Sequence, residues 1–122
     1  MKLYESSEDY LEQILMLTNK KGAIRSIDIV ESMSFSKPSV SVAMKKLREN
    51  GYIDVDSKGY ITLTKLGEEV ANKTYEKHLV LSLFFEKIGV SEENALKDAC
   101  RVEHDLSDET FEALKKHIEE LK

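Results

Sequence analysis

The 122-residue sequence lacks the features that mark several classes of protein. A single cysteine, Cys100, excludes an internal disulfide framework. No apolar run approaches the roughly 20 residues that a membrane-spanning helix needs, and residues 1–5 lack the apolar core of a secretory signal peptide. A Gly-rich phosphate loop, a His-Glu-x-x-His motif and a nucleophile–base set are also absent. These absences predict a cytoplasmic globular protein that is not an enzyme.

Acidic residues outnumber basic ones, but the excess lies in the second half of the chain. The net charge is -5. Residues 1–65 carry ten Lys or Arg against nine Asp or Glu, whereas residues 66–122 carry eight against fourteen. Within residues 36–65 the balance is six positive charges to three negative ones. Such a local basic patch can dock on DNA phosphates although the whole protein is acidic.

The first half of the chain predicts three helices followed by a hairpin. A helix over 7–20 has an apolar stripe and good caps in Ser6 and Ser7. After an extended piece at 23–25, Ser26 is predicted to cap a short helix that ends at Met33. A third helix begins near residues 36–38, with Pro38 in its first turn, and continues to residue 50. Alternating residues at 51–56 and 60–63 flank a Gly-containing turn, which predicts a β-hairpin.

The second half is predicted to be helical throughout. Thr64 should cap a long helix that ends near residue 87 and is apolar nearly all round at 79–85. Ser91 should cap a helix through residue 104, and Ser107 a last helix to the chain end. We therefore predict a mostly α protein with a small β-hairpin, built from a winged helix-turn-helix DNA-binding domain (1–63) and a C-terminal helical metal-binding and dimerisation domain (64–122).

The third predicted helix has the character of a DNA-reading helix. Its apolar positions, 40, 43, 44 and 47, share one face and leave small and polar residues on the opposite face. Ser hydroxyls can meet base edges, Val42 can touch a thymine methyl group, and Lys or Arg48 can anchor phosphates. The predicted DNA-contacting residues are Lys37, Pro38, Ser39, Ser41, Val42, Lys45, Lys46 and, at the hairpin tip, Lys58. The alternative is a solvated helix beside an ordinary hairpin.

A second group of residues offers metal ligands. Cys100, Glu103 and His104 stand at i, i+3 and i+4, so they project from one helix face. Thiolate, carboxylate and imidazole all bind divalent first-row metals. Asp9 and Glu12 form a further i, i+3 pair, and His78 lies on the long helix. Each group also has a structural alternative. The Glu103–His104 pair suits a solvated surface, Asp9 and Glu12 favour the N-terminal turn of any helix, and Cys100 and His78 suit a buried core.

Several strings of this sequence resemble the DtxR/MntR metalloregulators. Residues 99–104, Ala-Cys-Arg-Val-Glu-His, with Leu-Ser-Asp at 106–108, resemble the metal-binding segment of that family. Residues 8–14 resemble its first helix, and residues 39–41, the Lys46–Leu47 pair and residues 59–67 resemble its recognition helix and wing. The likeness covers nearly the whole chain in the right order.

The resemblance implies a homodimeric repressor that binds operator DNA when loaded with Mn(II) or Fe(II) and controls metal-uptake genes. It assigns as metal ligands Asp9, Glu12, His78, Cys100, Glu103 and His104. Asp9 and Glu12 look like the manganese branch, whereas Cys100 looks like the iron branch. Two further ligand positions of the iron branch fall on Ser82 and Leu96, which bind metal poorly. The chain stops where larger members continue into an SH3-like domain, so we expect a short form.

Electrostatics supplies a mechanism by which bound metal could switch DNA binding on. Without metal, the carboxylates of Asp9, Glu12 and Glu103 would bring like charges together. A divalent cation would cancel the repulsion, tie the first helix to the helical half and select one spacing of two recognition helices in a dimer. The alternatives are a winged-helix regulator that senses oxidants through Cys100, a metallohydrolase, and a purely structural dimerisation protein.

Overall fold

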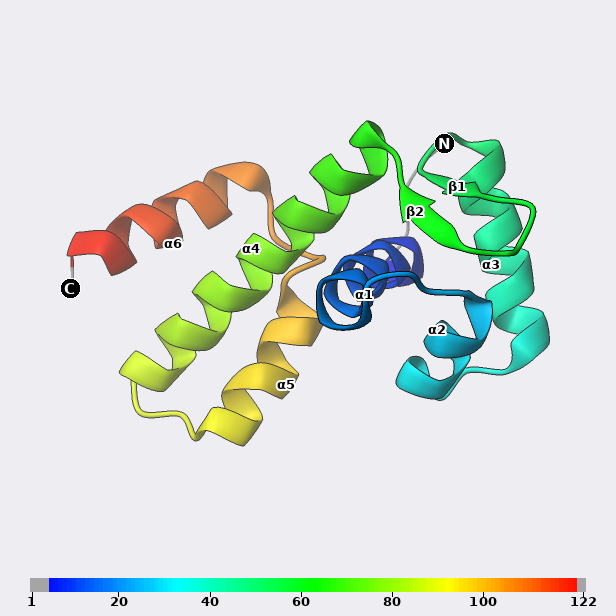
Figure 1. Cartoon of the computed structure of the whole chain (residues 1–122). Helices are drawn as coiled ribbons and strands as arrows, with labels where there is room; N and C mark the ends of the chain where they lie inside the picture. Colours follow the sequence, from blue (N-terminus) through cyan, green and yellow to red (C-terminus); the bar gives the residue numbers. More distant parts are fainter. Residues whose placement is uncertain (1–4, 121–122) are drawn as a thin grey trace. The chain divides into compact units, whose positions relative to one another are not determined.

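The computed structural model describes residues 5–120, and the elements of this part of the chain are drawn in Figure 1. They fall into two compact units, residues 1–72 and 73–122. The first four residues of the predicted DNA-binding domain and the last two of the predicted final helix lie outside the described residues.

The first unit contains the helices α1 (Glu5–Lys21), α2 (Ser26–Met33) and α3 (Lys37–Glu49). The chain turns sharply between α2 and α3 because Ser34 takes a left-handed conformation, with φ 57°. Ser36 then caps α3, its Oγ accepting a hydrogen bond from the Ser39 N–H at 3.3 Å. Pro38 fits the first turn of α3 because the N–H that it lacks has no partner inside a helix there.

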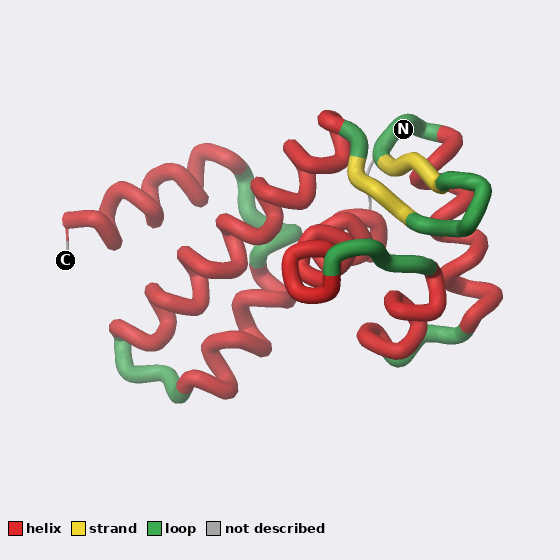
Figure 2. The backbone as a smooth tube through the Cα atoms, in the orientation of Figure 1, coloured by secondary structure: helices red, strands yellow, loops and turns green. Residues whose placement is uncertain are grey.

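A two-stranded antiparallel hairpin, β1 (Ile53–Val55) and β2 (Ile61–Leu63), follows α3 (Figure 2). At its tip the Asp56 Oδ1 accepts hydrogen bonds from the Lys58 and Tyr60 N–H groups, both at 2.9 Å. The other edge of β2 is also paired, because the Ile61 N–H donates to the Ile24 carbonyl at 2.8 Å. The hairpin is therefore fastened to the segment that precedes α2.

One hydrophobic core holds the first unit together. It draws residues from α1, α2, α3, the hairpin and the start of α4 (Lys65–Lys87). Its fully buried members include Leu11, Ile14, Ile29, Leu47 and Ile61. Burying a side chain of this size stabilises the fold by about 1.5–3 kcal/mol.

The junction between β2 and α4 is closely packed. The Thr64 hydroxyl donates to the Gly51 carbonyl at 2.6 Å and accepts from the Gly67 N–H at 3.1 Å. Gly67 lies directly against the backbone of Tyr52, where an added Cβ would stand 2.0 Å from the carbonyl oxygen. This position in α4 therefore requires glycine.

The second unit consists of the remainder of α4 with α5 (Glu92–Val102) and α6 (Asp108–Glu120). Ser91 and Ser107 cap α5 and α6 by accepting hydrogen bonds from the N–H groups of residues 94 and 110. Ion pairs join α6 to α4. The Lys73 Nζ lies 2.9 Å from the Asp108 carboxylate, and Lys115 pairs with Glu76. The buried apolar residues of this unit within the described part of the chain are Leu81, Ala95, Ala99, Phe111 and Ile118.

The predicted fold class is confirmed, with small shifts at the helix ends. The first helix includes Ser6 and Ser7, which were expected to cap it. Arg25 rather than Ser26 is the N-cap of α2, because the Asp28 carboxylate accepts the Arg25 N–H at 2.8 Å. The predicted helix over 91–104 ends at Val102. None of the described helices combines the length and apolar character that crossing a membrane would require.

Candidate metal centre and nucleic-acid interface

Four of the predicted metal ligands gather inside the second unit. The Nδ1 of His78, on α4, lies 3.2 Å from the Glu103 Oε2. The Cys100 Sγ, in the last turn of α5, lies 3.6 Å from the same Nδ1. The His104 Nε2 lies 3.4 Å from the Glu103 Oε1. Two imidazoles thus contact one carboxylate, and a thiol contacts one of these imidazoles.

Glu103 is the centre of this group and the best evidence that it suits a cation. Only 1% of Glu103 is exposed, and within residues 5–120 its Oε1 has no hydrogen bond of acceptable geometry. The His104 Nε2, 3.4 Å away, is near enough for an ion pair but is not aligned for a hydrogen bond. A buried carboxylate oxygen in this state is costly unless a cation is bound. The donor set fits a divalent first-row metal.

The chain positions these ligands through local structure. The carbonyl of His78 accepts a hydrogen bond from the Ser82 hydroxyl at 2.6 Å, one helical turn further along α4. Ser82 is buried and its hydroxyl proton is directed to the backbone, in keeping with the expectation that it binds metal poorly. Glu103 occupies the C-cap of α5 with helical dihedral angles, so it keeps its i+3 relation to Cys100.

The remaining two predicted ligands, Asp9 and Glu12, belong to the first unit. They stand three residues apart on α1, which places them on one face of that helix. Both are half-buried. Their assignment as ligands rests on the family resemblance, and the ligand set as a whole stays a prediction.

The eight predicted DNA-contacting residues are all exposed. Seven of them line α3, whose opposite face buries Val40, Met44 and Leu47 as the periodicity predicts. Val42 is 55% exposed, so its side chain is available for contact with a thymine methyl group. Ser39 is partly engaged, since its Oγ accepts a hydrogen bond from the Ser36 hydroxyl at 2.8 Å. Lys58 stands at the tip of the hairpin, as predicted.

Two further features were not predicted from the pattern of the sequence. The Arg25 guanidinium stacks on the Tyr60 ring, 4.4 Å from its centroid, and so links the start of α2 to the hairpin. Ile88 and Leu96 are 62% and 43% exposed, which adds apolar surface to the second unit. The apolar run that ends α4 and continues to Ile88 could have indicated this apolar surface. The Arg25–Tyr60 pair joins residues that only the folded chain brings together.

Family models match both halves of the chain. A model described as "Iron dependent repressor, N-terminal DNA binding domain" matches residues 2–61. A second, described as "Iron dependent repressor, metal binding and dimerisation domain", matches residues 64–122. Together with the winged helix and the ligand cluster, they define the class of protein: a metal-dependent transcriptional repressor.

Individual relatives narrow this class. An uncharacterised helix-turn-helix transcriptional regulator of Methanocaldococcus jannaschii is 36% identical over 120 residues, covering 97% of this chain and 96% of the relative. The regulator MntR of Lysinibacillus sphaericus is 37% identical over 102 residues, covering 84% of this chain and 73% of MntR. The chain belongs to the DtxR/MntR family of metal-dependent transcriptional repressors.

Solved structures are similar as well. The manganese regulator SloR superposes with a TM-score of 0.83 at 32% identity, covering 93% of this chain and 53% of SloR. The IdeR protein of T. acidophilum superposes with a TM-score of 0.79 at 26% identity, covering 97% of this chain and 55% of IdeR. The chain therefore spans about half the length of these two structures.

Proposed function

We propose that this chain is a cytoplasmic homodimeric repressor that binds operator DNA when loaded with Mn(II) or Fe(II) and controls metal-uptake genes. The observation that carries the proposal is the buried Glu103 carboxylate, which His78 and His104 contact, with Cys100 beside His78, in a chain that also carries a winged helix. The similarity to a manganese regulator supports Mn(II), and the descriptions of both family models support Fe(II).

In this proposal the ion receives ligands from both units. Glu103 supplies the charge-neutralising carboxylate, and His78 and His104 supply imidazole nitrogens, a donor set that suits either metal. Asp9 and Glu12, which the family resemblance adds to the set, belong to α1 in the first unit. Bound metal would therefore couple the unit that reads DNA to the unit that dimerises, and favour the arrangement in which both half-sites are engaged.

Each recognition helix has the surface that the major groove requires. The outer face of α3 carries small and polar side chains, with Lys45 and Lys46 available for phosphates. Two such helices in a dimer would read half-sites separated by about one or more helical turns of DNA. Apolar residues exposed on α4, Leu79 and Leu83, support a dimer through the second unit.

The test is duplex binding in the presence and absence of metal. A duplex can be selected from a random pool on the manganese-loaded protein, and its affinity then compared with Mn(II), with Fe(II) under anaerobic conditions, and with chelator. We expect tight binding only with metal. Replacing Lys45 or Lys46 by Ala should weaken binding and lower the salt dependence by about one unit of log–log slope. Equal binding with metal and with chelator would refute the proposal.

A second candidate function is oxidant sensing through Cys100. The thiol is exposed and its Sγ lies 3.6 Å from an imidazole nitrogen of His78, which leaves it open to oxidation by peroxide to sulfenic acid, with release of water. DNA binding by a sensor of this kind would respond to peroxide and not to metal. The Cys100→Ser variant should then lose its response, whereas under the metal proposal it changes metal affinity.

A further inference from the structure

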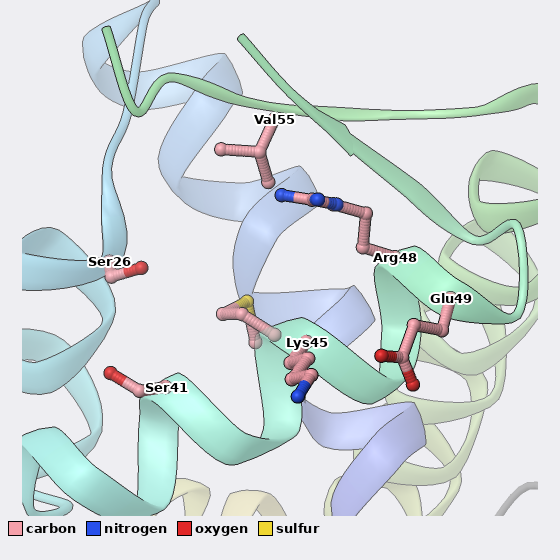
Figure 3. A pocket seen from close by; sticks show the side chains of 7 residues that line it. Ser26, Ser41, Lys45, Arg48, Glu49 and Val55 are labelled. Atoms are coloured by element: carbon pink, nitrogen blue, oxygen red, sulfur yellow. The ribbon is translucent and has the colours of Figure 1, made fainter. Parts of the chain in front are cut away.

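A surface pocket lies beside the predicted recognition face, where α2 begins and β1 passes α3. It has a volume of about 320 Å³. Figure 3 shows the Ser26 and Ser41 hydroxyls projecting toward one space, and Arg48 extending from α3 toward Val55. The remaining lining residues all belong to α3: Met44, Lys45 and Glu49. Neither Ser26 nor Val55 belongs to the predicted set of DNA-contacting residues.

The lining has the chemistry of an anion site with an apolar floor. Arg48 and Lys45 supply two positive charges against the single carboxylate of Glu49. The two serines supply hydroxyl donors, and a guanidinium together with hydroxyls is a common set of partners for phosphate oxygens. Met44 is 5% exposed, so it forms an apolar floor. A polar rim above an apolar floor matches one sugar-phosphate unit of nucleic acid, because the deoxyribose carbons can pack against the floor while the phosphate meets the rim.

Contacts outside the pocket hold the segments that carry two of its lining residues, Ser26 and Val55. The Ile61–Ile24 hydrogen bond, at 2.8 Å, ties the hairpin to the residues that lead into α2. The Arg25–Tyr60 stack, at 4.4 Å, adds a second link between the same two segments. Asp28 holds the Arg25 backbone and so fixes the start of the helix that presents Ser26. Ser26 and Val55 are thus held in place, which limits the entropy that binding would cost.

We propose that this pocket binds one phosphate of the DNA backbone, with Arg48 as its main partner and the Ser26 and Ser41 hydroxyls as additional donors. The inference rests on the proposed function and deepens it, because it assigns the strand contact that sets the register of α3 in the groove. The contact is independent of base sequence. Glu49 limits the positive charge of the pocket and so weakens the contact.

Variants of the two charged residues should have opposite effects on full-length, manganese-loaded protein. Arg48→Ala should weaken binding by about five- to tenfold on a selected duplex and on a random-sequence duplex alike, with the salt slope reduced by about one unit. Glu49→Gln should strengthen both. Arg48→Lys keeps the charge but loses the paired N–H donors of the guanidinium, so its affinity for the duplex should lie between those of wild type and Arg48→Ala. Lys116→Ala, a change of the same charge on the exposed face of α6, is the matched control and should bind as wild type does.

Duplexes in which single phosphates are replaced by neutral methylphosphonates locate the contact. We expect one position in each half-site where the replacement weakens wild-type binding by about five- to tenfold and leaves Arg48→Ala unaffected, since the two changes remove the same interaction. The assignment is overturned if the methylphosphonate weakens binding by Arg48→Ala as much as binding by wild type. It is also overturned if Arg48→Ala binds the unmodified duplex as tightly as wild type does. Saturable binding of inorganic phosphate by the DNA-free protein, lost in Arg48→Ala, would assign the pocket to a soluble anion and also overturn it. If wild type binds no duplex better with manganese than with chelator, the proposed function itself fails.

Discussion

The Nδ1 of His78 lies 3.2 Å from the Oε2 of Glu103, a residue 25 positions further along the chain. The contact joins α4 to the turn that follows α5 and places a buried carboxylate beside an imidazole. Two histidines and one carboxylate in this arrangement give the second unit a nearly complete set of donors for a divalent ion.

Replacing Glu103 or His104 by Ala should weaken metal binding without preventing the protein from folding. We expect Glu103→Ala and His104→Ala to fold, and to bind Mn(II) more than about a hundredfold more weakly, because losing a residue that merely supports a ligand costs about 10- to 100-fold. Both should fail to bind the selected duplex at high metal. Asp9→Ala should have the next largest effect. Calorimetric metal titration beside duplex binding measures both properties.

The conservative variant Glu103→Gln is the sharper form of this prediction. It keeps the shape of the side chain and removes a buried charge, so the metal-free protein should melt at a higher temperature while metal affinity falls. Undiminished metal-dependent DNA binding in Glu103→Ala and His104→Ala would reject the metal switch and favour thiol sensing.

Cys100→Glu should change metal preference without abolishing function. The Sγ lies 3.6 Å from His78, so a carboxylate at this position can reach the same group of ligands. Because carboxylate favours manganese more than thiolate does, we expect the ratio of Mn(II) to Zn(II) affinity to rise. Competition titrations on wild type and variant measure this ratio. A ratio that stays constant would show that Cys100 is not a ligand.

Dimerisation should depend on the apolar face of α4. Leu79 and Leu83 are 51% and 37% exposed and stand one helical turn apart, whereas Phe84 and Phe85 are half-buried. Placing Glu at 79 or 83 should give a monomer in sedimentation experiments and abolish duplex binding, because a charge cannot be buried alone in an interface. Leu66→Glu, at a residue 45% exposed in the first unit, should remain dimeric. A wild-type monomer at micromolar concentration with metal would contradict the prediction.

Gly67→Ala should destabilise the junction between the hairpin and α4. An added methyl group would stand 2.0 Å from the Tyr52 carbonyl oxygen, so the backbone must move. Overpacking of this kind costs about 1–3 kcal/mol. Urea unfolding should show that loss in Gly67→Ala and none in Glu68→Ala, a change at the exposed neighbouring position. Equal urea midpoints for Gly67→Ala and Glu68→Ala would refute the prediction that Gly67 is required at this junction.

The carboxylate of Asp28 should make the first unit sensitive to acid. The hydrogen bond from the Arg25 backbone, and then Lys21, lower the pKa of Asp28 below its ordinary value. Since the folded pKa is the lower one, the stabilisation is complete above the unfolded pKa and is lost as the pH falls through the folded value. Asp28→Ala should therefore cost about 0.5–1 kcal/mol at pH 7 and nothing well below pH 4. Urea unfolding of wild type and Asp28→Ala at both pH values, with Glu31→Ala as control, measures the loss of stability. A loss that is the same at both pH values would contradict the role given to the Asp28 carboxylate.

The periodicity of single elements was readable from the sequence, and contacts between elements were not. The spacing of Val40, Met44 and Leu47 predicted the buried face of α3, and the alternation around residues 57–59 predicted the hairpin. The prediction that Ser26 caps α2 was wrong because Asp28, at the third helical position, satisfies the N–H of Arg25 instead. Local preference places a cap only to within a residue or two.

The gathering of His78 with Glu103 needs the fold, since sequence spacing relates only residues that share one helix. The i, i+3 pattern placed Cys100 and Glu103 together and the resemblance added His78, but neither gave the burial of the carboxylate. The pocket beside α3 was hidden for the same reason, because its lining comes from α2, α3 and β1.

The turn at the hairpin tip determines how far Lys58 would reach in the proposed complex with DNA. Because the Asp56 Oδ1 already accepts hydrogen bonds from the N–H groups of Lys58 and Tyr60, residues 57–59 are ordered in the absence of DNA. The proposed association would then avoid an ordering entropy of about 1–2 kcal/mol for each of these residues. The turn acts as a spacer of fixed length. One inserted residue would move the lysine by about 3.3 Å, roughly the rise of a single base pair, and break the hydrogen bonds that keep it rigid.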